Sequence, residues 1–200
     1  MKVLFASFNQ GKVNVYKQMV LGSNIEFVSL SEIGCTQKVE ESGKDTIENA
    51  IIKAKFYHEL TGMPVVANDS GLIVEKFSKE KQPGVFVRRY KNKEMSDEDM
   101  IALYEKLFNE VGGESNGVFL VALAIIDSTG KLYSKQFYYD TYFRCPPCKV
   151  RVKGLPLRSF EYDKINGRYW AEETIEEQNK SEGEDVDLQK EFILEKLLKK

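Results

Sequence analysis

Hydrophobic and polar positions along the first third of the chain predict strands that alternate with helices. Apolar runs predict strands at Lys2–Ser7 and, with side chains alternating between two faces, at Ile25–Leu30. Polar turns separate these strands from two helices, Gly11–Val20 and Thr46 to about Leu60. In the second helix apolar residues recur at every third or fourth position, and a Gly-Met-Pro sequence ends it. This alternation is typical of an α/β fold.

The rest of the chain predicts a helix, a hairpin and a final helix. Ser96 and the acidic residues after it are typical of a helix start, and a Gly-Gly pair ends that helix. Val118–Asp127 is the most apolar stretch and Lys131–Phe143 alternates in character, so the two predict a hairpin. A last helix is expected from about Val186 to the end. Together these elements predict an α/β fold with a mixed sheet, as one domain over residues 1–200.

One apolar stretch of the first half is interrupted by a polar cluster. Val65–Ala67 predicts a short buried strand and Leu72–Phe77 predicts another, with Asn68, Asp69 and Ser70 between them. These residue types favour turns, so a turn between two strands is one interpretation. A ligand site is the other, because ligands of α/β proteins bind at strand ends. The pattern by itself leaves both interpretations open.

Composition and charge narrow the class of protein. Hydrophobic residues make up 42% of the 200 residues, which is enough for a substantial core. The chain has 29 basic and 31 acidic residues, and so lacks the basic excess of a dedicated nucleic-acid binder. Its first apolar run is shorter than that of a signal peptide, and no segment has the length of a membrane span. We therefore expect a soluble, cytoplasmic protein without nucleic-acid or membrane partners.

The three cysteines and the one histidine offer little chemistry. An odd number of cysteines does not indicate a disulfide framework. Cys145 and Cys148 have the spacing of half a zinc site or of a redox motif, but a second pair of ligands is missing. His58 lies inside a predicted helix, without a serine or cysteine partner for nucleophilic catalysis. A structural or incidental role is therefore the favoured interpretation of Cys35, Cys145 and Cys148.

A first polar cluster, Ser7–Lys12, joins the first strand to the first helix. The turn contains Asn9 and Gly11, and backbone N–H groups at a helix start favour an anion such as phosphate. Lys12 adds a positive charge beside those groups. The sequence is not a Walker motif, and a plain junction with Lys12 on the surface is the alternative interpretation.

A second cluster combines acids and lysines around the second helix. Glu40 and Glu41 precede this helix, and Lys53 and Lys55 lie on it. Mg²⁺ is usually bound by one or two carboxylates together with water and substrate phosphates. The alternative interpretation is that the acids interact with the helix dipole and that both lysines are solvated.

Residues 69–71 complete a set suited to phosphate chemistry. Asp69 can bind a metal or activate water, Ser70 can contact a phosphate oxygen, and Gly71 permits close approach to the backbone. Taken with the two lysines and the anion-favouring turn, these residues indicate chemistry on a Mg²⁺-bound nucleotide.

Four motifs, in order, resemble the inosine triphosphate pyrophosphatase family. SFNQGK resembles that family's T-x-N-x-x-K, and EESGKDTIENAIIKA resembles its stretch from E-E-T-G to E-N-A-x-x-K-A. VVANDSGLIV resembles A-D-D-S-G-L-x-V, and PGVFVRRY resembles P-G-V-Y-S-A-R-Y. The resemblance is dense from Met1 to about Tyr90. It implies an elongated α/β fold of two lobes around a central cleft, and a homodimer.

The resemblance also implies a reaction and a set of site residues. The reaction is Mg²⁺-dependent hydrolysis of a nucleoside triphosphate to the monophosphate and pyrophosphate. Glu40 and Asp69 would bind the metal, Asp69 would also act as the base, and Ser70 would contact substrate. Asp69, Lys12 and Lys53 are thereby the expected catalytic residues. The expected triphosphate-binding residues are Ser7, Asn9, Gln10, Gly11, Lys12 and Lys53.

The sequence departs from the family at one metal-side position and throughout the base-reading half. Asn68 replaces the first of two family aspartates, which removes one negative charge. Gly154–Ser159 aligns with the family's Gly-aromatic-Gly-aromatic-Asp-Pro segment, and its aromatic-Asp pair becomes Leu-Arg. GRYWAE, at 167–172, still resembles the family's G-R-T-aromatic-A-E. Gln178 then replaces a lysine, and residues 182–184 replace Ser-His-Arg by Glu-Gly-Glu.

Three functional interpretations follow from this contrast. The leading one is a nucleoside triphosphate pyrophosphohydrolase. The family's base specificity does not carry over, because a site that hydrogen-bonds a base discriminates through the cost of unpaired polar groups, and the family's base-reading groups are replaced here. A second is a catalytically impaired nucleotide-binding or regulatory protein on the same fold. A third is an enzyme that reads a different base, with Arg158 as a substrate-binding residue and Tyr169 and Trp170 as aromatic faces. Packing within the fold is the alternative role for these two aromatic residues.

Overall fold

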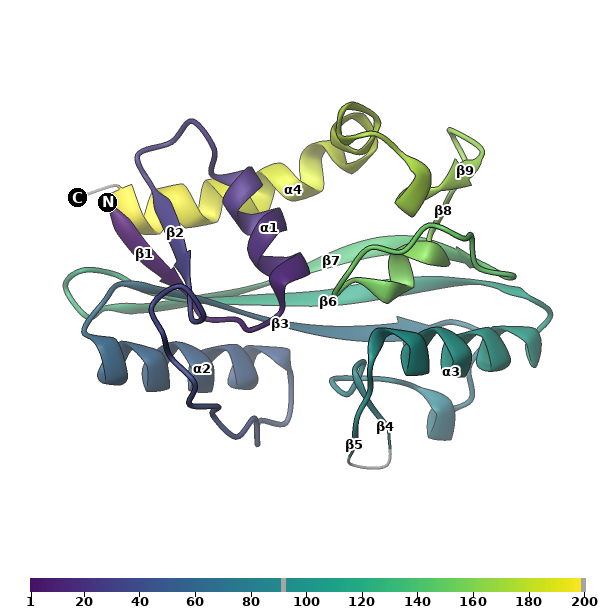
Figure 1. The fold of residues 1–200 in the computed structure, drawn as a ribbon, viewed down its shortest axis with the longest axis horizontal. Coiled ribbons are helices and arrows are strands. Elements are labelled where there is room, and N and C mark those ends of the chain that lie inside the picture. Colours follow the sequence, from purple (N-terminus) through teal and green to yellow (C-terminus); the bar gives the residue numbers. More distant parts are fainter. Residues whose placement is uncertain (91–92, 199–200) are drawn as a thin grey trace. The chain divides into compact units, whose positions relative to one another are not determined.

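The chain forms two compact units in the computed structural model, which describes residues 1–90 and 93–198 (Figure 1). For residues 175, 176 and 178–187 it describes the backbone alone. Unit 1 comprises Met1–Ser70, Val121–Phe137 and Glu184–Lys200. Unit 2 comprises Gly71–Leu120 and Tyr138–Gly183.

Helices and strands alternate through the first half of the chain and give way to a long hairpin, as the sequence predicts. The α-helices of the described residues are α1 (Gln10–Met19), α2 (Thr46–Thr61), α3 (Asp97–Asn109) and α4 (Ile175–Leu198). The strands are β1 (Lys2–Phe5), β2 (Glu26–Ser29), β3 (Val65–Val74), β4 (Arg89–Tyr90), β5 (Lys93–Glu94), β6 (Glu114–Ile126), β7 (Leu132–Arg144), β8 (Tyr162–Asp163) and β9 (Arg168–Tyr169). Short 3₁₀ helices lie at Lys79–Lys81, Pro156–Ser159 and Trp170–Glu172.

The main sheet has the strand order β2-β1-β3-β6-β7. Strand β1 runs parallel to both β2 and β3. Strands β6 and β7 are neighbours joined by only five residues, 127–131, so they must be antiparallel, because parallel strands need a much longer connection. The prediction of an α/β fold with a mixed sheet is therefore confirmed.

Strand β3 is continuous through the polar cluster. Two separate short strands were expected here, and this prediction is wrong: residues Val65–Val74 form one strand. Asn68 and Asp69 reach partners on other elements instead of turning the chain back on itself. Strand β1 pairs with β3 only at Leu4–Val65 and Phe5–Val66 and then ends. The polar residues therefore lie within a strand, just past the end of its parallel neighbour.

Unit 1 packs helices on both faces of its strands. Figure 1 shows α2 on one face and α1 with the end of α4 on the other. Small residues of α2, Ala50 and Ala54, are fully buried in the core and allow the helix to lie close to the sheet. On the other face, the ring of Tyr16 from α1 stacks on Phe5 with a centroid distance of 4.5 Å.

Unit 2 has an aromatic core centred on α3. Phe108 of this helix is fully buried, and its ring lies 5.0 to 6.2 Å from four other rings. As the sequence predicts, Ser96 caps the helix: its hydroxyl accepts from the N–H of Asp99, and the Asp99 carboxylate accepts from Ser96. The four rings around Phe108 belong to Phe77, Tyr104, Phe143 and Phe160.

Helix α4 begins eleven residues before the expected start at Val186. Residues 175–185, before the expected start, contain four glutamates, which are good helix formers even without an apolar face. Within the described residues, no helix combines the length and the apolar character that a membrane crossing requires.

Candidate phosphate and metal site

The turn after β1 is organised by its own polar side chains. Asn9 caps α1, since its side-chain oxygen accepts from the N–H of Lys12 at 3.2 Å. The N–H of Asn9 in turn donates to Ser7 Oγ at 3.1 Å. Gly11 is buried, whereas Gln10 is exposed and donates to Asn14 Oδ1 at 2.8 Å. The helix start is thus fixed within the first polar cluster of the sequence.

Lys12 connects this turn to β3. Its Nζ donates to Ser70 Oγ at 3.1 Å, although 58 residues separate the two in sequence. The hydroxyl of Ser70 donates to Asn68 Oδ1 at 3.3 Å. Two of the three polar clusters therefore meet beyond the end of β1. The alternative interpretation of Lys12 as a merely solvated surface residue is not supported by this contact.

Lys53 joins the remaining cluster to Asp69. Its Nζ lies 2.8 Å from Asp69 Oδ1, and the two residues are 8% and 6% exposed. Asn49, one turn earlier on α2, donates to the other Asp69 oxygen at 3.4 Å. Lys53 is therefore buried, and the interpretation of this lysine as a solvated helix residue is wrong, whereas Lys55 is exposed. Helical spacing puts Asn49 and Lys53 on one face, toward β3.

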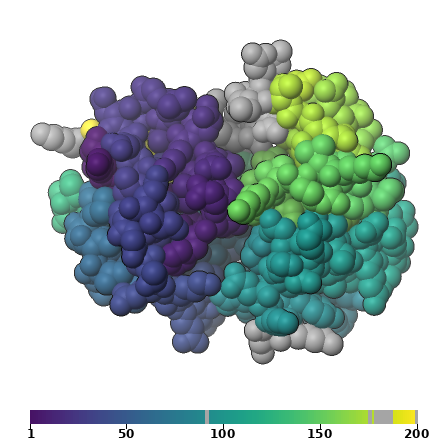
Figure 2. Space-filling model, in the orientation of Figure 1, coloured from purple at the N-terminus to yellow at the C-terminus, as the bar shows by residue number. Residues whose placement is uncertain are grey.

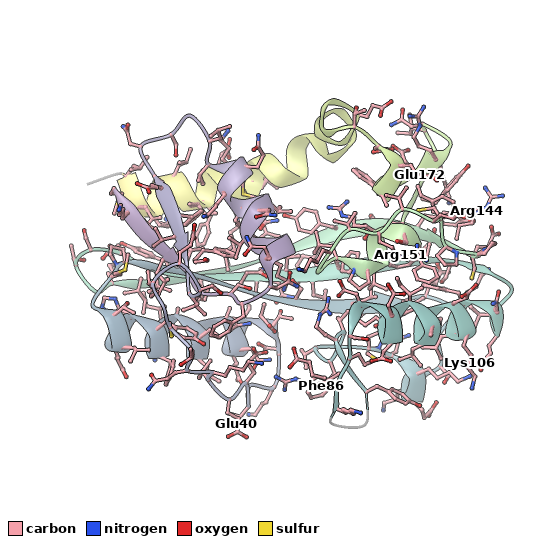
Figure 3. All side chains as sticks on the ribbon, viewed as in Figure 1. Glu40, Phe86, Lys106, Arg144, Arg151 and Glu172 are labelled. Atoms are coloured by element: carbon pink, nitrogen blue, oxygen red, sulfur yellow. The ribbon has the colours of Figure 1, made fainter. Side chains whose placement is uncertain are left out.

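Glu41, and not Glu40, is the acid of its pair that lies beside this lysine. Glu41 Oε1 is 3.6 Å from Lys53 Nζ, while Glu40 is exposed on the loop before α2, as Figure 3 shows. Gly43 anchors the loop, because its N–H donates to Asn49 Oδ1 at 2.8 Å. A Cβ at position 43 would lie 2.7 Å from that oxygen, so the close approach requires glycine.

Two carboxylates, those of Asp69 and Glu41, approach the ammonium group of Lys53. Lys12 contacts Ser70, the neighbour of Asp69 on β3. Asp69 and Glu41 both approach one Nζ atom, so they lie close enough to share a cation. A divalent cation with water and phosphate ligands fits this pair of oxygen donors. In the described part of the chain no three His, Cys, Asp or Glu side chains form a metal-binding group, so phosphate or water would supply the remaining ligands.

Arg158 lies in unit 2, in contacts of its own. Its guanidinium is 5.1 Å from the centre of the Trp170 ring and 3.7 Å from Glu161 Oε2. Tyr169 donates its hydroxyl to Pro146 O at 2.7 Å. These contacts fit a packing role for both aromatic residues, and substrate binding by Arg158 stays a prediction. The side chains at 178 and 182–184, where the base-reading residues differ from the family, lie outside those that the structure describes.

The cysteines are thiols directed at backbone carbonyls. Cys145 Sγ contacts Glu105 O at 3.8 Å, and Cys148 Sγ contacts Val150 O at 3.7 Å. Burial raises the pKa of both thiols above the ordinary value, which makes the reactive thiolate less available. The geometry therefore agrees with a structural role.

A cavity of about 530 Å³ in unit 2 has no part in this cluster. Phe86, Lys106 and Leu107 are among its lining residues, and the first two are labelled in Figure 3. An ion pair between Lys81 and Glu110, 2.5 Å long, lies at its wall. None of the predicted site residues lines it, so the candidate site rests on the charged cluster of unit 1.

Sequence reasoning missed three residues of the arrangement. Asn49 stands in the E-N-A motif, so its contact with Asp69 could have been suspected from the resemblance. Tyr16 and Gln189 gave no such signal: the Tyr16 hydroxyl donates to Gln189 Oε1 at 2.6 Å and accepts from Asn68 Nδ2 at 3.1 Å. A contact across 173 residues is not visible in local patterns.

Comparisons with known proteins show which family and which relatives the chain resembles. The Ham1 family matches residues 3–146. A dITP/XTP pyrophosphatase of Bacillus licheniformis is 38% identical over 128 residues, which are 62% of this chain and 63% of that protein. A dITP/XTP pyrophosphatase of Porphyromonas gingivalis is 32% identical over 130 residues, 65% of this chain and 66% of that protein. The chain thus spans slightly less than two thirds of the length of these relatives.

Solved structures share the fold over nearly the whole chain. A HAM1 protein from Coxiella burnetii has a TM-score of 0.72 at 23% identity and covers 98% of this chain and 99% of its own. A nucleoside-triphosphatase, or dITP/XTP pyrophosphatase, from Mycobacterium abscessus has a TM-score of 0.66 at 26% identity and covers 94% and 97%. Figure 2 draws the first of the quoted motifs, Ser7–Lys12, in purple and the later ones in blue to teal.

Proposed function

Because the chain belongs to the Ham1 family, we propose that it is a nucleoside triphosphate pyrophosphohydrolase, which converts a triphosphate to the monophosphate and pyrophosphate. The observation that carries this proposal is the buried contact of Lys53 with Asp69, 2.8 Å long, beside Lys12 and Ser70. These two contacts bring the ammonium groups of Lys53 and Lys12 to adjacent residues of β3, one of which is a carboxylate. Such groups are what phosphoryl chemistry requires: cations for the phosphates and a base for water.

The phosphate-binding role belongs to the turn before α1 and the two lysines. Backbone N–H groups at the helix start and Lys12 Nζ bind phosphate oxygens. Ser70 Oγ, which already contacts Lys12, binds a neighbouring oxygen. Lys53 transfers part of its interaction from Asp69 to the substrate, so that a lone pair of Asp69 becomes available. Ser7 and Asn9 keep the turn in shape for this binding.

Asp69 is the proposed base. It accepts the proton of a water molecule whose oxygen attacks the α-phosphorus, and the bond from that phosphorus to the bridging oxygen breaks. The electron pair leaves with pyrophosphate. Asp69 and Glu41 would hold Mg²⁺, with the exposed Glu40 as the alternative second carboxylate. When bound, Mg²⁺ neutralises charge on the phosphate oxygens and lowers the barrier to attack.

The base that the enzyme prefers is a separate part of this proposal. The B. licheniformis and P. gingivalis relatives are named for dITP and XTP, and a purine triphosphate of this kind is a first substrate to test. The residues that replace the family's base-reading groups predict altered selectivity, since a donor-poor site discriminates weakly. We also propose that the protein is a cytoplasmic homodimer. Light scattering on the purified protein tests whether it is a dimer.

The test of the proposal is pyrophosphate release with Mg²⁺ across a panel of triphosphates. The panel contains the four common ribonucleotides and deoxyribonucleotides together with the inosine and xanthosine forms. Asp69→Asn is expected to reduce the rate at least 1,000-fold on the best substrate, because the base is lost while the shape of the side chain stays.

One control variant and two contrary outcomes decide how that result is interpreted. Asp127→Asn removes a carboxylate of the β6–β7 turn and should leave the rate unchanged. Among the described residues this carboxylate bonds Thr129, Lys131 and Tyr133. Full activity of the Asp69→Asn protein would exclude Asp69 as the base. Nucleotide binding by the wild-type protein without any pyrophosphate release would favour the catalytically impaired alternative.

A further inference from the structure

A chain of hydrogen bonds crosses the interior of unit 1 from α1 through β3 to α4. Lys12 donates to Ser70 at 3.1 Å, and Ser70 donates to Asn68 Oδ1 at 3.3 Å. Asn68 Nδ2 donates to Tyr16 Oη at 3.1 Å, and Tyr16 donates to Gln189 Oε1 at 2.6 Å. We call these five residues the Asn68 network.

The inner members of the network are buried. Asn68 is 3%, Tyr16 5% and Gln189 6% exposed. Buried polar groups without partners destabilise a fold, so a network at this depth has to satisfy its members internally. The polar atoms of Asn68 face other protein groups within the strand and helices of unit 1 and so are occupied by the network.

The direction of the donors distinguishes an amide from a carboxylate at position 68. The backbone oxygens of Ala122 and Asp69, each 3.4 Å from Asn68 Nδ2, can only accept. The group that faces them must therefore be a donor. Tyr16 gives its single O–H to Gln189, so it receives its bond from Asn68 as an acceptor. An aspartate at this position would put a carboxylate oxygen against two carbonyl oxygens.

From this geometry we infer that Asn68 is a positioning residue for phosphate binding and not a weakened metal ligand. It fixes the hydroxyl of Ser70, which in turn fixes the ammonium group of Lys12. Tyr16 and Gln189 hold the amide in that orientation, and α4 thereby supports the phosphate site from the far end of the sequence. This inference rests on the proposed function for the identity of the ligand, a triphosphate.

Its test needs no catalysis. The probe is inorganic triphosphate, titrated calorimetrically in the presence of EDTA, so that neither metal nor base contributes to the measured Kd. Tyr16→Phe and Gln189→Met each remove one link and are expected to weaken binding about fivefold, the effect of one lost neutral hydrogen bond. Gln189→Glu keeps an acceptor oxygen for Tyr16 whether or not it is protonated, and should restore most of the affinity relative to Gln189→Met.

A matched control is available in unit 2. Tyr104 is also a buried tyrosine, 2% exposed, and its hydroxyl donates to the backbone oxygen of Val87 and to no network member. Tyr104→Phe should bind inorganic triphosphate as the wild-type protein does. Thermal unfolding of every variant shows whether the protein is folded at the titration temperature. Unchanged affinity of folded Tyr16→Phe and Gln189→Met proteins would overturn the inference.

Asn68→Asp separates positioning from metal binding. A positioning amide predicts about tenfold weaker triphosphate binding and no fall in the Mg²⁺ concentration needed for half-maximal pyrophosphate release. A weakened metal ligand predicts the opposite: the added carboxylate would lower that Mg²⁺ concentration. Absence of triphosphate binding by the wild-type protein would also overturn the inference. Wild-type binding without pyrophosphate release would instead contradict only the proposed hydrolysis.

Discussion

Unit 1 buries a lysine–aspartate ion pair beside its sheet, whereas the core of unit 2 is centred on a cluster of aromatic rings. In unit 1, Lys53 and Asp69 form an ion pair with side chains 10% and 9% exposed. In unit 2, Phe108 is fully buried among four other rings, and the ion pair of Arg88 with Asp97 keeps side-chain exposures of 28% and 29%. Burying an ion pair contributes little to stability, whereas burying rings contributes much. The buried pair of unit 1 is therefore consistent with the chemical role proposed for Asp69 and Lys53.

The ion pair of Arg88 with Asp97 in unit 2 has a different role. Arg88 donates to the backbone oxygen of Gly154 at 3.0 Å, and Asp97 accepts from the N–H of the same glycine at 2.7 Å. The two side chains thus hold both polar groups of one loop residue. That loop leads into the segment that aligns with the family's base-reading motif. Arg88 and Asp97 thus hold a backbone segment in place, whereas Lys53 and Asp69 of unit 1 are directed at each other.

The largest expected effect concerns the aromatic core of unit 2. Phe108→Ala should lower the free energy of unfolding by about 4 kcal/mol, because a fully buried ring is lost and a cavity remains. Urea unfolding measures this loss, which should be nearly the same at low and high salt, since no charge is involved. A loss below about 1 kcal/mol would show that the aromatic core does not stabilise unit 2 as its burial suggests.

Lys53→Met is expected to have the next largest effect. It leaves the carboxylate of Asp69 buried without its cation, which should lower the free energy of unfolding by about 3 kcal/mol. Mg²⁺ should restore part of that loss if Asp69 and Glu41 bind it, and calorimetry of the folded variant measures this binding directly. The control is Lys17→Met, which breaks an exposed pair with Glu32 and should cost less than about 1 kcal/mol. Equal losses in the two variants would contradict the distinction between buried and exposed pairs.

The smallest expected effect concerns the exposed pair of Lys17 with Glu32 and how its contribution to stability depends on pH. Hydrogen bonds from Lys17 and Ser29 lower the pKa of Glu32 from 4.5 to about 2. A carboxyl with a lowered folded-state pKa contributes stability that is complete above the unfolded value and is lost as the pH falls through the folded value. The free energy of unfolding of Glu32→Gln should therefore differ from wild type by less than about 1 kcal/mol at pH 7. The difference should vanish between about pH 4.5 and pH 2, and a difference that grows on acidification would refute this assignment.

Local patterns in the sequence predict much of the fold and part of the site. The start of α2 follows from its apolar spacing and that of α3 from the Ser96 cap, and Gly62 ends α2 in the left-handed region with φ of 67°. The resemblance to inosine triphosphate pyrophosphatases is confirmed by the Ham1 match. Lys12, Lys53, Asp69 and Ser70, named from separate motifs, do come together.

The features that local patterns do not predict depend on contacts between separate segments. Turn-forming residues 68–70 stay in a strand because neighbours on α1, α2 and β6 satisfy them, which local propensity does not register. The choice between Glu40 and Glu41 depends on how the loop packs through Gly43. Gln189 has no motif, and only the folded chain brings it to Tyr16.

The most direct test of the proposed chemistry identifies which phosphate bond is broken. Wild-type protein, Mg²⁺ and an inosine or xanthosine triphosphate are followed by ³¹P NMR in water enriched in ¹⁸O. The site described here predicts resonances of the monophosphate and of pyrophosphate, with the heavy oxygen in the monophosphate alone, because water attacks the α-phosphorus. Formation of the diphosphate and orthophosphate, or heavy oxygen in pyrophosphate, would contradict that chemistry.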